Sequence, residues 1–585
     1  MCGIAGILAA PGATPSGAVL DRLQDALRHR GPDGSGRHVE GRVGLVQTRL
    51  AIIDLEGGRQ PLHAGGATLV ANGEVYNYLE LRDGMKDCLF ATHSDCEPPL
   101  HLYLGEGPAF TKRLRGMYAI ALHDPAHDRL LLARDPFGIK PLYVAETPAG
   151  LAFASEAQAL VAAGLVAPVV NRTARDQLLQ LQFACGRQTL FEGIRRVLPG
   201  ETLVLEDGFA ARQEQRSPLP DGGPVPISEG AALMELDRRL NDTVGIHQRS
   251  DVPYGMFLSG GIDSSVLLAM MTRLNERPVQ ALTAGFPGTA ARDERDHARA
   301  VAKAAGADHH EVEFTADDFW RLLPEVAATL DDPVADYAIL PTYKLAAAAR
   351  AAGLKVVLSG EGGDELFAGY SRYRRAARWR LLGGRPMRAK GILEGLGVLR
   401  HEDRAWRDPI AAVEAEAQRG GRSRLQAQQA VDVADWLPND LLLKLDRCLM
   451  AHGVEGRVPF LDPILADFAV RLPDSLKVKR GLGKWLLRRW LETALPAARP
   501  FERKRGFTVP VGDWIAARGR TLGPLVAAQP GIAEACRREA VERLFASADP
   551  KAGKAAWTLL FYALWHQRHI LGRRLAPDAM EALAG

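Results

Sequence analysis

The sequence lacks long hydrophobic runs. No uninterrupted apolar segment reaches the ~20 residues that a membrane-spanning helix needs, and the start shows no charged segment followed by an apolar core and a cleavage site. We therefore expect neither a membrane protein nor a secreted one. Paired cysteines are missing too. The six cysteines are scattered without CxxC or Cys/His spacing, so nothing suggests a disulfide framework or a zinc site. The expected location is a reducing cytoplasm.

An excess of charge of one sign is also absent. The chain has 73 Lys and Arg against 70 Asp and Glu, a net charge of +3, which indicates no particular partner. Hydrophobic residues make up 47% and charged residues 24%, as in ordinary globular proteins. At 585 residues the chain exceeds the ~250–300 residues at which single cores stop growing. At least two cores are expected.

The pattern of apolar residues changes along the chain. From Arg42 to about Val204, short apolar alternations broken by turn residues, the first of them from Val43 to Ile53, predict a strand-rich domain. Residues 217–226 are rich in proline and glycine without a helical or strand period, which is typical of a linker. Beyond them, helical segments alternate with brief apolar strands, which predicts an α/β domain with a parallel sheet. We therefore expect a first domain at residues 1–215, a linker at 216–227 and a second domain at 228–585. The brief strands are expected at 254–258, 280–286 and 355–358.

Cys2 directly follows the initiator Met1. Removal of Met1 would place a thiol and a free α-amine on one residue. An α-amine titrates near pH ~8, so it can accept the thiol proton, as in N-terminal nucleophile enzymes. The alternative is a small buried residue behind a start codon.

A short apolar strand ending at Leu258 runs into Ser259, Gly260 and Gly261, and an apolar-periodic helix begins near Asp263. Glycines let a backbone approach an anion, and a helix N-terminus directs N–H groups at it, so this turn predicts a phosphate cradle. Asp263 would repel phosphate unless a divalent cation intervened. The sequence therefore suggests a magnesium-bridged pyrophosphate, with a purely structural turn as the alternative.

A second glycine-rich loop follows the apolar strand 356–358. It contains Ser359, Gly360, Glu361 and Asp364. Because ligands lie outside the carboxyl ends of strands in open α/β sheets, the two loops are expected to converge on one nucleotide. Asp263 and Asp364 would then share Mg²⁺, and Glu361 would remain available as a base. An acidic helix N-cap is the alternative for Asp364.

Several strings occur together in order. In the first half they are Met1-Cys2-Gly-Ile-Ala-Gly-Ile7, Arg30-Gly-Pro-Asp-Gly34, Thr48-Arg49-Leu-Ala-Ile-Ile-Asp54, Asn72-Gly73-Glu74-Val-Tyr-Asn77, Ser94-Asp95-Cys-Glu97, Leu114-Arg-Gly-Met-Tyr-Ala119 and Arg134-Asp-Pro-Phe-Gly-Ile-Lys-Pro-Leu-Tyr143. The second half adds the two loops, Asp446-Arg447, Glu455-Gly-Arg-Val-Pro-Phe-Leu-Asp462 and Lys504-Arg-Gly-Phe507. With them the chain resembles, nearly end to end, the glutamine-hydrolysing asparagine synthetases, which are class II glutamine amidotransferases joined to an ATP pyrophosphatase domain.

The resemblance implies a fold and a set of roles for the first half. The fold is an α+β Ntn-hydrolase-type glutaminase domain of stacked antiparallel sheets with helices. Cys2 would attack the glutamine carboxamide, with Asn72 and Gly73 as the oxyanion hole. Arg49 would bind the α-carboxylate, and Asp95 with Glu74 the α-ammonium of glutamine. A plain hairpin turn at Asn72-Gly73 and a solvated Arg49 are the alternatives.

For the second half the resemblance implies an α/β adenine-nucleotide-hydrolase-like domain of the PP-loop ATP pyrophosphatase type. Its substrates would be ATP and aspartate, with Mg²⁺ at Asp263 and Asp364 and with Glu361 deprotonating the incoming ammonium or the tetrahedral adduct. Met117, Ala119 and Ala121 are candidates for an apolar ammonia passage, and a homodimer is left open. The implied ATP and pyrophosphate contacts are Leu258, Ser259, Gly260, Gly261, Asp263, Ser264, Ser265, Phe286, Ser359, Gly360 and Lys504, with core packing as the alternative for Phe286.

Some segments depart from the family pattern. Pro98 and Pro99 stand where aliphatic helix residues are usual, although prolines fit a first helical turn. Segment 332–342 resembles the region near the acceptor, which varies among relatives, so another carboxylate on a peptide, cell-wall precursor or secondary metabolite is the alternative to aspartate. A catalytically idle sensor is a third possibility. The arginine-rich segment 372–390 predicts a solvated face beside an anionic nucleotide rather than a nucleic-acid contact.

Overall fold

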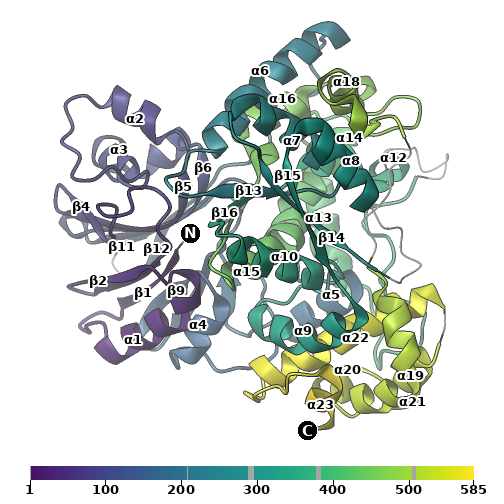
Figure 1. Ribbon diagram of the computed structural model, residues 1–585. Coiled ribbons are helices and arrows are strands. Elements are labelled where there is room, and N and C mark those ends of the chain that lie inside the picture. The colour runs from purple at the N-terminus through teal and green to yellow at the C-terminus, as the bar shows by residue number, and fades with distance from the viewer. Residues whose placement is uncertain (1, 207–208, 288–294, 377–383, 503–508, 548) are drawn as a thin grey trace.

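The computed structural model describes residues 2–206, 209–287, 295–376, 384–502, 509–547 and 549–585 (Figure 1). Within these ranges, no helix is both long and apolar enough to cross a bilayer.

The first part of the chain forms two six-stranded antiparallel sheets. Their facing sides share an apolar cluster that includes Ile4, Val70, Ala119 and Phe153, so the sheets are stacked. The first sheet has the order β10 (Ile194–Arg196), β8 (Tyr143–Thr147), β9 (Gly150–Ala154), β1 (Gly3–Ala9), β3 (Val43–Arg49) and β2 (Gly34–Glu40). The second has the order β12 (Phe209–Gln215), β11 (Glu201–Glu206), β7 (Arg129–Arg134), β6 (Gly116–Asp124), β5 (Ala67–Val75) and β4 (Leu62–Ala64).

Helices cover both outer faces of this stack (Figure 1). Helix α1 packs beside β1 and β3, and α3 lies beside β4 and β5. Helix α3 begins at Pro98 with prolines in its first turn, as expected, because a proline there costs no helical hydrogen bond. The helices of this part are α1 (Gly17–Ala26), α2 (Tyr78–Gly84), α3 (Pro98–Glu106), α4 (Ala157–Ala162) and α5 (Arg172–Leu181).

The second part is built on a five-stranded parallel sheet, as the alternating pattern predicts. Its order is β15 (Asp308–Glu313), β14 (Gln280–Gly285), β13 (Tyr254–Phe257), β16 (Val356–Leu358) and β17 (Glu455–Arg457). Residues 216–228, between the two parts, contain no helix or strand. The fold class is thus the expected one: stacked antiparallel sheets with helices, followed by an α/β domain.

The second part also contains helices along its length. They include α6 (Glu229–His247), α7 (Ile262–Leu274), α8 (Arg295–Ala305), α9 (Ala316–Thr329), α10 (Ile339–Ala351), α11 (Gly363–Leu366), α15 (Leu443–Met450), α16 (Pro463–Arg471), α17 (Asp474–Lys477) and α18 (Trp485–Ala494). The others are α12 (Ser371–Ala376), α13 (Asp408–Ala417), α14 (Arg424–Val431), a π-helix (Asp432–Leu442), α19 (Val511–Ala527), α20 (Pro530–Ala535), α21 (Arg538–Phe545), α22 (Pro550–His569) and α23 (Ala579–Ala584).

The strand boundaries differ from expectation in two places. Strand β1 at Gly3–Ala9 precedes the region expected to be strand-rich, because its glycines and alanines give a weak strand signal although it lies centrally in its sheet. Strand β3 ends at Arg49 rather than near Ile53, and the residues after it form a loop.

Candidate active sites

Cys2 lies at the start of β1, where that strand pairs with the end of β3. Its backbone nitrogen donates to Asn72 Oδ1 at 3.2 Å. The Asn72 side chain has no exposed surface, and its Nδ2 has no hydrogen-bond partner among the described residues. A buried donor without a partner is costly, so the Asn72 amide is available to hold a developing oxyanion, a role that stays a prediction.

Burial raises the pKa of the Cys2 thiol. The thiolate is therefore scarce at neutral pH, and a nearby base is needed to form it. The α-amine that Met1 removal would create lies on Cys2 itself and is the base that the sequence predicts.

Gly73 follows Asn72 on β5 and lies opposite Tyr118 of β6. A Cβ atom at this position would lie 2.1 Å from the Met117 carbonyl oxygen. Only glycine permits this approach of the two strands, which keeps the Asn72-Gly73 backbone in place.

Arg49 is 8% exposed, so the alternative of a solvated arginine is wrong. Its guanidinium donates to the carbonyl oxygens of Leu55 at 2.9 Å and Asp54 at 2.6 Å. It therefore orders the loop after β3, while its role in binding the glutamine carboxylate stays a prediction.

Two buried carboxylates lie next to this site. Burial raises the pKa of Asp95 to about 6, although the Val75 N–H, which donates to Asp95 Oδ2 at 2.8 Å, opposes the rise. Burial, then the nearby Asp95, also raises the pKa of Glu74 well above its usual value. Two neighbouring buried carboxyl groups disfavour each other's ionisation, and a nearby cation favours it. The ammonium group of glutamine, which the family resemblance assigns to them, would supply such a charge.

The two glycine-rich loops meet as predicted. Strands β13 and β16 are parallel neighbours, with Met256 opposite Leu358, so their loops leave the same edge of the sheet. They line a cavity of about 600 Å³. The predicted residues that line it are Leu258, Ser259, Gly260, Gly261, Asp263, Ser264, Ser359, Gly360, Glu361 and Asp364.

Two predicted nucleotide contacts among the described residues do not line the cavity. Ser265 is completely buried in α7, behind the loop. Phe286 is buried and packs edge-on against Phe314, with ring centroids 6.1 Å apart, which is the alternative that the sequence left open. Lys504 lies outside the described residues, so its placement stays a prediction.

Asp263 and Asp364 converge on one cation of the protein, Lys484. The Lys484 ammonium contacts Asp263 and lies 2.7 Å from Asp364 Oδ1. A Cβ at Gly363 would lie 2.5 Å from Asp263 Cγ, so glycine lets the second loop reach this carboxylate. Sequence reasoning missed Lys484, although the Gly-Leu-Gly run before it at the start of α18 was an available signal.

Glu361, on the second loop, also lines the cavity. Burial raises the pKa of Glu361, and Asp336, Asp364 and Asp263 raise it further, while Lys444 opposes them. Lys444 also donates to Asp336 at 2.7 Å. A raised pKa fits a carboxylate that accepts a proton near neutral pH. Asp336 belongs to the segment expected near the acceptor, and Asp336 lines the cavity.

The arginine-rich segment 372–390 contributes to this cavity through Arg372 and Arg388. Both form ion pairs with the buried Asp432, at 2.7 Å and 3.1 Å. Both guanidiniums thus line the cavity while they pair with a carboxylate that is completely buried.

Buried ion pairs join the two parts of the chain. Arg30 has no exposed surface and donates to Glu156 at 2.8 Å and to Asp446 at 2.8 Å and 3.1 Å. Arg447 extends the network to Asp331 at 2.7 Å. The glutaminase-like sheets are therefore fixed against the parallel-sheet domain by charges that would be costly to separate.

The three candidates for an ammonia passage, Met117, Ala119 and Ala121, lie on β6 but in two different apolar clusters. Met117 belongs to the large apolar cluster that also contains Leu50 and Leu258. Ala119 and Ala121 instead belong to the cluster between the two antiparallel sheets. Met117 is thus the candidate on the side toward the second domain.

An asparagine synthase family model matches residues 235–567, more than half of the chain. The chain belongs to the asparagine synthase family. A glutamine amidotransferase domain model matches residues 1–215 of this family member.

Named relatives agree with this assignment along the whole chain. A Mycobacterium tuberculosis protein provisionally named a glutamine-hydrolysing asparagine synthetase is 36% identical, over 97% of this chain and 97% of its own. Asparagine synthetase 1 of Bacillus subtilis is 31% identical over 96% and 95%. Asparagine synthetase B of Escherichia coli is 32% identical over 84% and 79%.

Proposed function

We propose that this protein is a glutamine-dependent asparagine synthetase that consumes ATP. The observation that carries the proposal is the pairing of a buried cysteine and an unpartnered Asn72 amide in one domain with a two-loop nucleotide cavity in the next. Buried ion pairs hold the two parts together, as a transfer of ammonia between them requires.

In the glutaminase half-reaction, the α-amine of Cys2 takes the thiol proton after Met1 removal. The thiolate attacks the glutamine carboxamide carbon, and the Asn72 amide with the Gly73 N–H stabilises the resulting oxyanion. Collapse breaks the C–N bond, and the proton passes from the amine to the leaving ammonia. Water then cleaves the thioester, which releases glutamate and restores the thiol.

In the synthetase half-reaction, the aspartate β-carboxylate attacks the α-phosphorus of ATP and pyrophosphate leaves. Ser259, Gly260 and Gly261 hold the phosphates at the N-terminus of α7. Ammonia attacks the acyl carbon of the adenylate, AMP leaves, and Glu361 accepts the surplus proton. An apolar route past Met117 would keep ammonia unprotonated on its way.

The donor set at the cavity fits Mg²⁺. Asp263 and Asp364 present carboxylate oxygens to one point beside the phosphate loop, and Mg²⁺ binds through one or two carboxylates together with substrate phosphates. When bound, the ion would neutralise charge on the departing pyrophosphate. Lys484 holds the two carboxylates together.

The test is an incubation of purified, Met1-processed protein with amide-¹⁵N-glutamine, ATP, Mg²⁺ and aspartate, in which asparagine, AMP and pyrophosphate are measured together. We expect labelled asparagine to appear in step with AMP and pyrophosphate. Cys2→Ala is expected to abolish glutamine-dependent synthesis and to leave ammonia-dependent synthesis intact, while Cys88→Ala, outside the site, retains both. Glutamine hydrolysis without asparagine or AMP would overturn the aspartate assignment and indicate a different carboxylate acceptor.

A further inference from the structure

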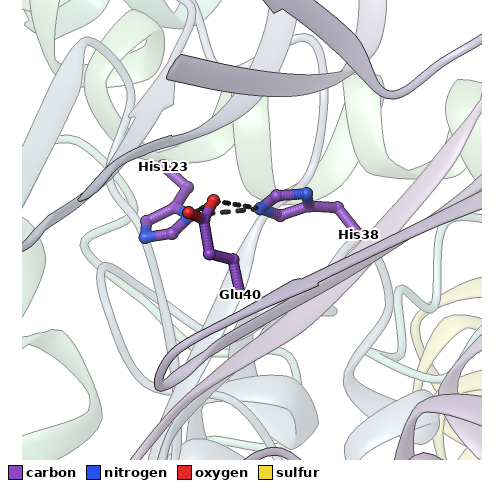
Figure 2. A group of neighbouring side chains, drawn as sticks. All are labelled: His38, Glu40 and His123. Carbon is purple, nitrogen blue, oxygen red and sulfur yellow. Dashed lines mark hydrogen bonds and ion pairs between the residues drawn. The ribbon is translucent and has the colours of Figure 1, made fainter. Parts of the chain in front are cut away.

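Two histidines and a glutamate, His38, Glu40 and His123, form a cluster in the first part of the chain (Figure 2). His38 and Glu40 come from β2, two residues apart on one side of the strand, and His123 comes from β6. His38 Nε2 lies 3.2 Å from His123 Nδ1 and 3.6 Å from Glu40 Oε2, and His123 Nδ1 lies 4.0 Å from Glu40 Oε2.

The separation of the two nitrogens fits the edge of a metal coordination shell, and the two distances to Glu40 are slightly longer. Zn²⁺ binds nitrogen and carboxylate oxygen at ~2.0–2.2 Å in a tetrahedron, so its ligand atoms stand about 3.3–3.5 Å apart. The two nitrogens are already at that separation, and Glu40 needs to move by only a few tenths of an ångström. Its side chain is 51% exposed and therefore free to move.

An imidazole binds a metal ion through a ring nitrogen that carries no proton. His38 and His123 each present one ring nitrogen, Nε2 and Nδ1, to the point that they share with Glu40. The His63 ring, 5.8 Å from that of His38 between centroids, adds a third imidazole beside the cluster. A hydrogen bond between two neutral rings would also explain the 3.2 Å separation, and the test below separates the two explanations.

We propose that His38, Glu40 and His123 bind one divalent transition-metal ion, with Zn²⁺ as the best match to two imidazoles and one carboxylate and with water at the fourth position. Cysteine and histidine spacing gave no sign of this site, because His123 comes from a strand far along the chain.

The position of the site gives it a structural role. Strand β2 is the edge of one antiparallel sheet and β6 is in the other, so the ion would cross-link the two layers. His38 lies opposite Leu45 on β3, and Arg49 follows four residues later, about 13 Å along the strand. The ion would thus stabilise the glutaminase-like domain at the end remote from the Cys2 thiol.

The test is calorimetric titration of the chelator-treated full chain with Zn²⁺, together with metal analysis after dialysis. We expect one tight Zn²⁺ per chain that is lost in His38→Ala and His123→Ala, and an affinity at least about tenfold lower in Glu40→Gln. His127→Ala, an exposed histidine close to the cluster, is the matched control and is expected to bind like the wild type. Zn²⁺ is expected to raise the Tm of the wild type and the control only.

Glutamine hydrolysis at the wild-type rate verifies that each variant is folded, because none of these residues lies at the glutamine site. If a histidine variant fails to fold, the Zn²⁺ affinity of Glu40→Gln, a change at an exposed side chain, tests the site instead. Equal Zn²⁺ stoichiometry and affinity in the wild type and in the folded variants would overturn the site and leave a histidine pair joined by a hydrogen bond.

Discussion

The Arg457 guanidinium lies 3.5 Å from the Glu74 carboxylate, Nη2 to Oε2, although the two residues belong to different domains. Glu74 directly follows the Asn72-Gly73 pair, while the Arg457 carbonyl accepts the Ser359 N–H at 2.8 Å at the start of the second nucleotide loop. A single residue thus contacts a carboxylate of the predicted glutamine site with its side chain and the second nucleotide loop with its backbone.

Arg457→Lys is expected to loosen this connection. Lysine keeps a positive charge but loses the fork that binds Glu455 at 2.6 Å and the His247 and Arg249 carbonyls at 3.0 Å and 2.7 Å. We expect a higher KM for glutamine and more than one glutamine hydrolysed per asparagine formed, measured by parallel glutamate and asparagine assays. Arg238→Lys, on an exposed ion pair, is the control. An unchanged ratio would limit Arg457 to a packing role.

Asn72→Ala is expected to lower the kcat of glutamine hydrolysis by roughly 10²–10³-fold, because the oxyanion loses one preorganised donor. Ammonia-dependent synthesis should continue at the wild-type rate. Asn171→Ala is the matched control, since Asn171 caps α5 and its loss should cost about 1 kcal/mol of stability without changing either rate. Glutamine hydrolysis unaffected by Asn72→Ala would exclude the oxyanion role.

The sequence predicts the loops of the nucleotide site because strand, glycine turn and helix are contiguous there, and parallel neighbouring strands bring such loops together. It does not predict Lys484, Lys444 or Arg457, since each reaches its partner from a distant element of the tertiary fold. Phe286 shows how a local pattern can predict a contact that the fold does not make. An aromatic residue at the end of a strand has the same local sequence pattern whether it faces a ligand or, as here, packs against Phe314.

The pKa of Asp95, about 6 in the folded protein, predicts a pH dependence. Asp95 binds the glutamine ammonium only as a carboxylate, so we expect the KM for glutamine to rise as the pH falls below about 6. The folded protein binds more protons than the unfolded chain between the ordinary pKa of aspartate, ~4, and 6, so Asp95 also makes the protein less stable as the pH rises through that window.

Glutaminase kinetics between pH 5 and 8 measure this effect, with about 6 as the expected midpoint. Asp95→Asn removes the titrating group, so its weaker glutamine binding should be independent of pH in this range. Ammonia-dependent synthesis provides the internal control, because it does not use the glutamine site. A KM for glutamine that stays constant down to pH 5 would contradict the role of Asp95.

Lys484→Met should impair the synthetase half-reaction and leave glutamine hydrolysis intact, the reverse of Asn72→Ala. Without the Lys484 ammonium, Asp263 and Asp364 lose a positive charge that offsets their repulsion for each other and for the incoming phosphates. We expect pyrophosphate release to fall roughly 10²-fold with either nitrogen source, while glutamine hydrolysis continues. Lys479→Met is the control, because Lys479 pairs with Glu229 on the surface. Raising Mg²⁺ should restore part of the activity of Lys484→Met if the carboxylates hold the metal. Unchanged pyrophosphate release would instead show that Lys484 does not support the chemistry at this site.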